Sequence, residues 1–207
     1  MSNRPNFLFV ITDQHRADYL GCYGHPILST PQIDSLAARG RRFDRFYVAS
    51  PVCMANRSTL MTGRMPSLHG VRHNGIPLSL RANTFVDLLR VNGYRTALVG
   101  KSHLQNFVGR APILRRPEPP SGRTVPPEEF AEPLKPSPCE GRYNQEQPIG
   151  WQEKTDFNMD LPFYGFEHVD LCTEHGDLVG GHYDQWLRER RPDADKLRGA
   201  DNALPHD

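Results

Sequence analysis

Residues 84–103, TFVDLLRVNGYRTALVGKSH, predict a helix that leads directly into a buried strand. Thr84 is a favoured N-cap residue and Gly93 a favoured stop, so we expect the helix to span residues 85–92. The apolar run at 96–99 has no polar interruption, as in a strand covered on both faces. A helix that feeds such a strand is the repeating unit of α/β proteins.

The rest of the chain repeats this alternation of short apolar runs and amphipathic segments. A continuous apolar run ends at Asp13, and Ser29-Thr30-Pro31 supplies the start signals of a helix. We expect strands at 6–12, 42–49, 96–99 and 168–172, and helices at 31–39, 54–62, 85–92 and 182–191. Strand, helix and strand in this order indicate βαβ units. The predicted fold class is α/β, with a mainly parallel sheet flanked by helices.

Composition divides the chain into three segments. Residues 1–110 hold most of the predicted elements. Residues 111–150 carry ten of the nineteen prolines and few aliphatic side chains, which predicts a long excursion from the core. Residues 151–207 add a further core segment and a polar tail without periodic structure.

Charge and apolar runs exclude several classes of protein. The chain has 25 Lys+Arg and 24 Asp+Glu, and this net charge of +1 gives no reason to expect nucleic acid or an anionic membrane as partner. The longest apolar run, 7–11, is far shorter than the roughly 18 residues that span a bilayer. The first residues lack a secretory signal, so we expect a cytoplasmic protein. Neither a zinc knuckle nor a disulfide framework is indicated, because no CxxC pair joins Cys22, Cys53, Cys139 and Cys172.

Chemically active residue types follow three of the predicted strands. These are Asp13, then Cys53 with Arg57, then Lys101 with His103. Because the carboxyl ends of parallel strands share one edge of a sheet, we expect these residues to converge there.

Cys53 allows two interpretations. A free cysteine is often a small buried apolar residue. Here, however, it begins a predicted helix whose first turn contains Asn56, Arg57 and Ser58, and such a helix N-terminus favours an anion. A cysteine phosphatase is excluded, because Thr59 stands where the Cys-x5-Arg pattern requires arginine. Arg57 itself is either part of this site or a solvated first-turn residue.

Residues 53–57, CMANR, resemble the C-x-[PA]-x-R signature of the sulfatase family, in which the cysteine is oxidised to formylglycine. Further segments match the family in order: 6–14 its opening strand and metal-binding aspartate, 20–24 G-C-Y-G, 30–36 T-P-N-x-D-x-L, 60–64 L-x-T-G, and 93–104 G-Y-x-T with G-K-W-H-L. The chain is similar to the N-terminal portion of formylglycine-dependent sulfatases of the alkaline-phosphatase-like superfamily.

The resemblance implies a role for each matching residue. Cys53 would be converted by a formylglycine-generating enzyme, and its hydrate would attack a small-molecule sulfate ester. Asp13, together with residue 53, would bind a divalent metal, Ca²⁺ or Mg²⁺. Arg57 would hold the hydrate. Lys101 and His103 would neutralise the transferred sulfate and assist the leaving group.

Other positions leave the substrate open. Asn74 matches an asparagine near the substrate in the family, or is a turn residue before Gly75. Gln14 replaces a second aspartate, which resembles the choline-sulfatase and phosphonate monoester hydrolase branches. Those branches often lack the pair that is present here as Lys101 and His103. Sulfate esters are therefore the first prediction, and phosphonate or phosphate esters the alternative.

The segment 173–177, TEHGD, imitates a second metal-binding segment of the family. It lies too early and has Glu174 where an aspartate is expected, so we interpret His175, Asp177 and His182 as solvated loop residues. Family members are usually more than twice as long as this chain. We therefore expect the isolated 207-residue chain to be catalytically incomplete, with little or no turnover.

Overall fold

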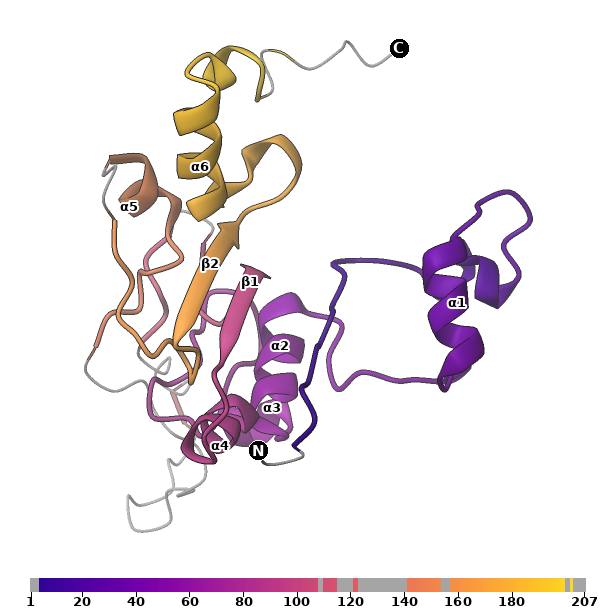
Figure 1. Ribbon diagram of the computed structural model, residues 1–207. Helices are drawn as coiled ribbons and strands as arrows, with labels where there is room; N and C mark the ends of the chain where they lie inside the picture. The colour runs from indigo at the N-terminus through magenta and orange to yellow at the C-terminus, as the bar shows by residue number, and fades with distance from the viewer. Residues whose placement is uncertain are drawn as a thin grey trace. The chain divides into compact units, whose positions relative to one another are not determined.

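The computed structural model describes residues 4–107, 110–114, 121–122, 141–153, 157–199 and 202 (Figure 1). Cys139, much of the proline-rich segment and the end of the polar tail lie outside these ranges. The chain forms two compact units, Met1–Tyr47 and Val48–Asp207.

The first unit is organised around a short helix. Its elements are the 3₁₀ helices η1 (Ala17–Tyr19) and η2 (Gly21–Tyr23) and the helix α1 (Pro31–Arg39). Asp34 on α1 accepts hydrogen bonds from the backbone N–H of Cys22, at 2.7 Å, and from the Thr30 hydroxyl, at 2.8 Å. This carboxylate ties η2 to α1. The helix predicted at 31–39 is confirmed.

The strands predicted at 6–12 and 42–49 are not present. Both segments lack strand pairing, and their large apolar side chains are exposed; Leu8, for example, is 90% exposed. A strand is completed by hydrogen bonds to a neighbour, and an apolar run specifies only the extended tendency of its own residues. These two predictions are therefore wrong for this structure.

The second unit contains the sheet and its helices. In chain order it has α2 (Cys53–Thr62), α3 (Pro66–His69), α4 (Phe85–Val91), β1 (Ala97–Lys101), α5 (Pro148–Glu153), β2 (His168–Thr173), η4 (Gly176–Leu178), β3 (Gly180–Gly181), α6 (His182–Arg190) and η5 (Ala194–Lys196). The predicted helices at 54–62, 85–92 and 182–191 and strands at 96–99 and 168–172 are confirmed within one or two residues. None of the helices in the described ranges is long and apolar enough to cross a membrane.

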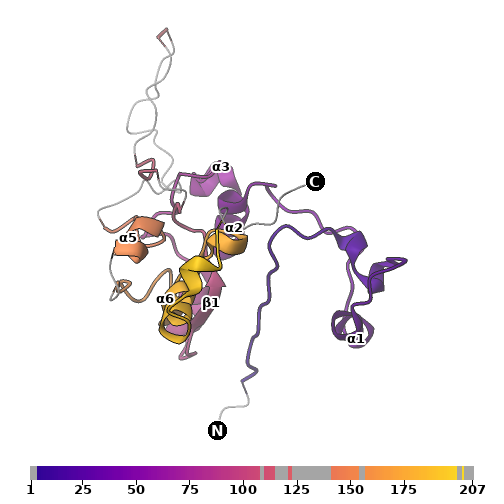
Figure 2. The same cartoon turned by 90° about the horizontal axis from the view of Figure 1, so that it is seen from above.

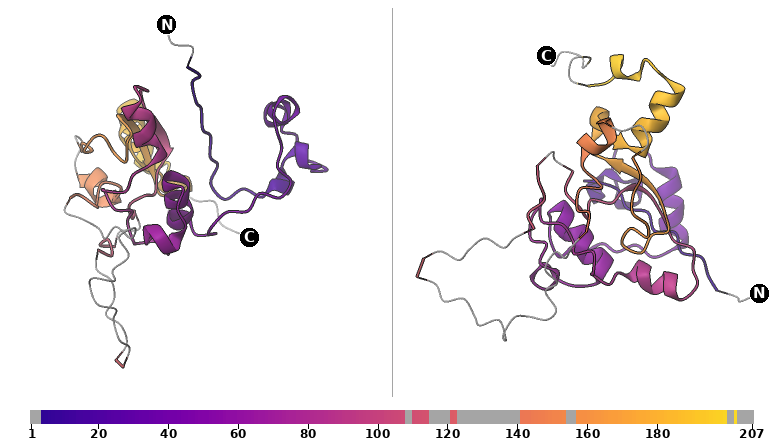
Figure 3. Two further views of the ribbon diagram at one scale, coloured as in Figure 1. Left: turned by 90° about the horizontal axis from the view of Figure 1, so that it is seen from below. Right: turned by 90° about the vertical axis from the view of Figure 1, so that its left-hand side faces the viewer.

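The sheet has the order β1-β2-β3, in which β1 and β2 are parallel and β3 is antiparallel to β2. Ala97 lies opposite His168, and Lys101 opposite Cys172. Helix α4 precedes β1 at one end of the sheet, and α6 follows the other end and contacts β2 (Figures 1 and 3). Figure 2 shows α6 and β1 from above. The α/β class is confirmed, with a mixed and partly parallel sheet.

The core of this unit lies between α2, α4 and β2. Its largest buried members are Met54, Leu78, Leu104, Phe163 and Leu171. The prediction that 96–99 is buried on both faces is only half right. Leu98 packs against the core, whereas Val99 points the other way and is 77% exposed.

Buried His69, at the end of α3, holds two helices together as a neutral ring. Its Nδ1 accepts a hydrogen bond from Val71 N at 3.1 Å, so the proton is on Nε2, which lies 3.0 Å from the Thr59 hydroxyl. Thr59 in turn donates to Ala55 O. A second proton on His69 would face the Val71 N–H, and burial lowers the pKa of His69 to about 4.

We expect this histidine to make the second unit sensitive to acid. The pKa of His69 is lower in the folded chain than its ordinary value of 6.5, so the unfolded chain takes up the proton first as pH falls. The free energy of unfolding should therefore decrease between about pH 6.5 and pH 4, by roughly 1–3 kcal/mol from this group. Urea unfolding at a series of pH values, compared with His69→Gln, measures the effect. An unchanged pH slope in His69→Gln would contradict it.

Candidate active site

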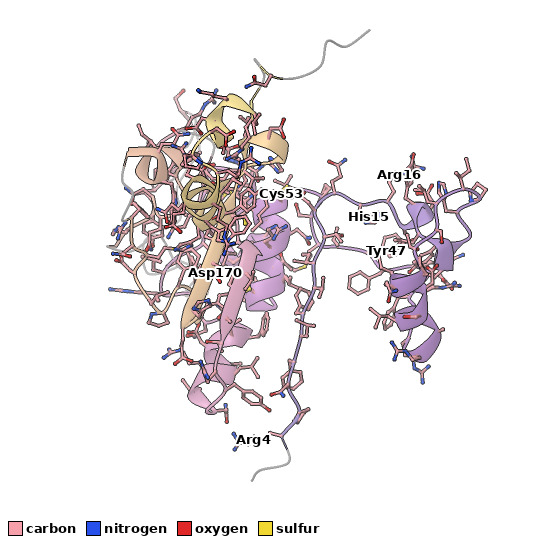
Figure 4. The ribbon with its side chains drawn as sticks, turned by 45° about the horizontal axis from the view of Figure 1, so that its top comes forward. Arg4, His15, Arg16, Tyr47, Cys53 and Asp170 are labelled. Carbon is pink, nitrogen blue, oxygen red and sulfur yellow. The ribbon has the colours of Figure 1, made fainter. Side chains whose placement is uncertain are left out.

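Helix α2 begins with Cys53 and is followed by Gly63 in the left-handed conformation. Its N-cap residue, Val52, provides no side-chain acceptor. Instead, Asn74 Oδ1 accepts a hydrogen bond from Met54 N at 3.1 Å, which satisfies one of the open donors of the first turn. Cys53 is partly exposed rather than buried as a small apolar residue, and it lies at the positive end of the helix (Figure 4).

Arg57 lies one turn along α2 and joins this helix to the sheet. Its Nη1 donates a hydrogen bond to the carbonyl oxygen of Lys101, the last residue of β1, at 2.8 Å. The side chain is only 8% exposed, so the interpretation of Arg57 as a solvated residue is wrong. Because arginine keeps its proton in proteins, the bond places a permanent positive charge close to the start of α2.

The side chain of Lys101 meets a residue that follows β2. Lys101 Nζ lies 2.7 Å from His175 Nε2 and 5.1 Å from the centre of the Phe107 ring. An ammonium group only donates, so His175 Nε2 is the acceptor. His175 is exposed, as expected, but its contact with Lys101 was not predicted. This contact follows from the parallel register of the two strands, in which Lys101 lies opposite Cys172; a correct prediction of that pairing would have indicated it.

His103 is buried, with 2% of its surface exposed, and its ring stacks on Phe107 with the ring centres 3.8 Å apart. Its backbone has φ = 53°, a left-handed conformation that is uncommon for a residue other than glycine. Phe107 also makes an edge contact with His175, at 5.7 Å between ring centres. The two histidines and Lys101 therefore surround one aromatic ring.

A buried carboxylate that the sequence did not reveal binds the backbone of the loop at residues 103–105. Glu146 is completely buried, and it accepts hydrogen bonds from the backbone N–H groups of His103 (2.7 Å), Leu104 (3.1 Å) and Gln105 (3.1 Å). Burial raises the pKa of Glu146 to about 7, and these hydrogen bonds act in the opposite direction. Glu146 lies in the segment 111–150, which the sequence predicted to be a proline-rich excursion from the core, so nothing in the sequence indicated that it would be buried.

Asp13 belongs to the first unit, whereas the other predicted site residues belong to the second. It is exposed, and its Oδ1 accepts a hydrogen bond from Gln14 N at 2.8 Å. Within the described part of the chain, no group of three or more His, Cys, Asp or Glu side chains could hold a metal ion. Asp13 and Cys53, the residues predicted to bind a metal, therefore do not by themselves form a complete site for a divalent cation.

The structure thus links five predicted site residues through a few contacts. Asn74 holds the start of the helix that carries Cys53 and Arg57, and Arg57 holds the end of the strand that carries Lys101. His103 follows two residues later. The start of α2 thus combines a partly exposed thiol, a helix N-terminus and the Arg57 guanidinium, which together favour a bound anion.

The part of the chain that contains the predicted site residues is similar to known proteins. Residues 5–111 match the family model described as Sulfatase. The N-acetylglucosamine-6-O-sulfatase of Bacteroides thetaiotaomicron is 35% identical over 103 residues, which cover 50% of this chain and 18% of that protein. Human arylsulfatase A is 39% identical over 108 residues, covering 48% of this chain and 21% of that protein.

Among solved structures, one described as a complex with its substrate D-glucosamine-2-N,6-O-disulfate is 33% identical. It aligns with a TM-score of 0.48 over 53% of this chain and 22% of that chain. The matched half of this chain spans about a fifth of the length of the curated relatives.

We expect Asn74 to stabilise α2 as a remote cap. Asn74→Ala should lower the free energy of unfolding by about 1 kcal/mol, because Met54 N–H loses its acceptor. Asn74→Asp is the matched control: it keeps an acceptor oxygen and adds a negative charge near the helix N-terminus, so it should be at least as stable as the wild type. Urea unfolding followed by circular dichroism measures both. Equal stability of Asn74→Ala and wild type would contradict this role.

Proposed function

The chain belongs to the sulfatase family, and on this premise we propose that it hydrolyses sulfate esters through a formylglycine formed at Cys53. The observation that carries the proposal is the hydrogen bond between Arg57 and Lys101 O. It joins the CMANR motif on α2 to the end of β1, two segments 44 residues apart, and so supports the proposal that both motifs contribute to one site.

The charges of this site suit a sulfate ester. The N-terminus of α2, Arg57 and Lys101 are all positive, and a sulfate monoester carries one negative charge spread over three oxygens. Preorganised positive groups of this kind stabilise the charge that develops during group transfer.

In the proposed reaction, one hydroxyl of hydrated formylglycine 53 gives its proton to a base in the site as its oxygen attacks the sulfur atom. The bond between sulfur and the ester oxygen breaks, and the alcohol oxygen takes up a proton from an acid in the site and leaves. The second hydroxyl then loses its proton, the bond between the formylglycine carbon and the sulfate oxygen breaks, and the aldehyde re-forms as sulfate is released; a water molecule hydrates the aldehyde again. In this proposal Lys101 offsets the charge of the sulfate, and His103 moves the proton to the leaving group.

A divalent cation, Ca²⁺ or Mg²⁺, is part of the proposal through Asp13 and residue 53. Such a cation would supply charge neutralisation at the sulfate oxygens. A single carboxylate binds a hard cation weakly, because Ca²⁺ and Mg²⁺ prefer six or more oxygen ligands. The proposed bond-breaking and proton-transfer steps therefore use only residues of the second unit, namely residue 53, Lys101 and His103.

Two alternatives remain from the sequence. Gln14 favours phosphonate or phosphate esters, whereas Lys101 and His103 favour sulfate esters. The second alternative is that the chain is catalytically incomplete, since Asp13 is its one predicted carboxylate ligand. Conversion of Cys53 and the preference between sulfate and phosphonate esters distinguish both alternatives from the proposal.

We expect conversion of Cys53 to depend on Arg57. After co-expression with a formylglycine-generating enzyme, which uses dioxygen as oxidant, mass spectrometry of the Cys53 peptide should show the mass loss for replacement of CH₂–SH by an aldehyde. Arg57→Ala should reduce the converted fraction, since the arginine is part of the recognised motif. Peptides that contain Cys22 or Cys172 are internal controls. Absence of conversion in the wild type would contradict the assignment.

We expect the converted 207-residue chain to prefer p-nitrophenyl sulfate over a phenyl phosphonate ester if it turns over either one. Arg57→Ala should lower the rate by at least about 100-fold, equivalent to about 2.7 kcal/mol of transition-state stabilisation. Arg57→Lys keeps the charge but not the planar fork, so a near wild-type rate would contradict a positioning role for Arg57. Turnover of neither ester by a converted chain would support the incomplete-chain alternative, and a preference for the phosphonate would support the other.

A further inference from the structure

Glu146 is a buried carboxylate with an unusual set of partners. It has no exposed surface, and three consecutive backbone N–H groups, those of residues 103–105, donate to its two oxygens. Oε2 accepts from His103 N, whereas Oε1 accepts from both Leu104 N and Gln105 N. Removing a carboxylate from water is costly, and bonds from several N–H groups are what make it tolerable in the interior.

This arrangement fixes a backbone conformation that the loop would not otherwise prefer. Successive N–H groups converge on one anion where the chain makes a concave turn, and one such turn alternates right-handed and left-handed residues. His103 is the left-handed residue here, with φ = 53°. A left-handed conformation is unfavourable for a residue with a Cβ, so a compensating interaction is needed to hold it. The carboxylate of Glu146 provides it.

The conformation of His103 determines where its side chain lies. Its ring stacks on Phe107 at 3.8 Å, and the same aromatic ring lies 5.1 Å from Lys101 Nζ and 5.7 Å from the His175 ring. A change in the backbone at residue 103 would therefore displace the His103 ring from the Phe107 ring on which it stacks. The Phe107 ring is also the one that Lys101 and His175 contact. Glu146 acts on these side chains through the backbone of residues 103–105.

We propose that Glu146 is a positioning residue of the active site: by binding the backbone N–H groups of residues 103–105, it sets the arrangement of His103, Phe107 and Lys101. The proposal rests on the proposed function, since it is through Lys101 and His103 that Glu146 would affect the hydrolysis. Its structural part, the control of the His103 conformation, can be measured without turnover.

Two substitutions and a matched control test this structural part. Glu146→Leu removes both acceptor oxygens and so all three hydrogen bonds. Glu146→Gln keeps one carbonyl oxygen, which can retain the bonds from Leu104 and Gln105, while its NH₂ group faces the His103 N–H. The control is Gln147→Ala, because Gln147 is also buried but donates from Nε2 to Arg110 O, outside this loop.

The readout is amide hydrogen exchange by NMR at residues 103–105, together with the ring resonances of His103. In Glu146→Gln, exchange at His103 should become at least about tenfold faster, and the changes at Leu104 and Gln105 should be smaller. In Glu146→Leu all three amides should exchange faster, and the His103 ring resonances should shift in both variants. The proposal is overturned if these signals stay within about twofold of wild type in Glu146→Gln, or if Gln147→Ala changes them equally.

An activity measurement on the converted chain completes the test. Glu146→Gln should lower kcat for p-nitrophenyl sulfate at least about tenfold with little change in KM, as expected when a group is misplaced rather than removed from binding. Gln147→Ala should stay within about twofold of wild type. A wild-type kcat in Glu146→Gln would overturn the positioning role. If the wild-type chain has no turnover, the proposed function fails for this chain, and the exchange data alone decide whether Glu146 positions His103.

Discussion

The parallel pairing of β1 with β2 is the constraint on which the arrangement of this site depends. Parallel strands end at the same edge, so Lys101 and the residues after Cys172 emerge together although they are more than 70 residues apart. The contact between Lys101 Nζ and His175 follows directly from this register. Without the pairing, neither the charge of Lys101 nor the ring of His175 would have a defined place relative to α2.

The sequence predicted well the elements whose signals are local. Thr84 forms a reciprocal capping box with Asp87 at the start of α4, and Gly63 ends α2 in the left-handed conformation that glycine allows. These residues specify helix boundaries through neighbours only three or four positions away. The ends of α2, α4 and α6 could therefore be predicted within one or two residues.

The features that were missed depend on residues far apart in the chain. An apolar run such as 6–12 specifies a tendency to extend, but a strand also needs a partner, and no strand pairing forms in the described residues of the first unit. Glu146 binds a loop about 40 residues before it, and Arg57 binds a carbonyl 44 residues after it. No periodicity or turn signal encodes such contacts. The motif CMANR indicated that Arg57 belonged to a site, but not that it would be buried.

Three polar side chains share one kind of task in this site. Asn74 binds the N–H of Met54, Arg57 binds the carbonyl of Lys101, and Glu146 binds the N–H groups from His103 onward. In each case the side chain fixes the backbone at or beside a residue predicted to act on the substrate. The side chain of that residue is then left to meet a ligand or a neighbour. Arg57 and Glu146 are buried, and a buried polar group loses much more free energy than a solvated one when its partner is removed, so these two bonds hold their segments strongly. A site built in this way gains its precision from contacts between side chains and backbone, and that is why its geometry extends beyond the residues that a motif can reveal.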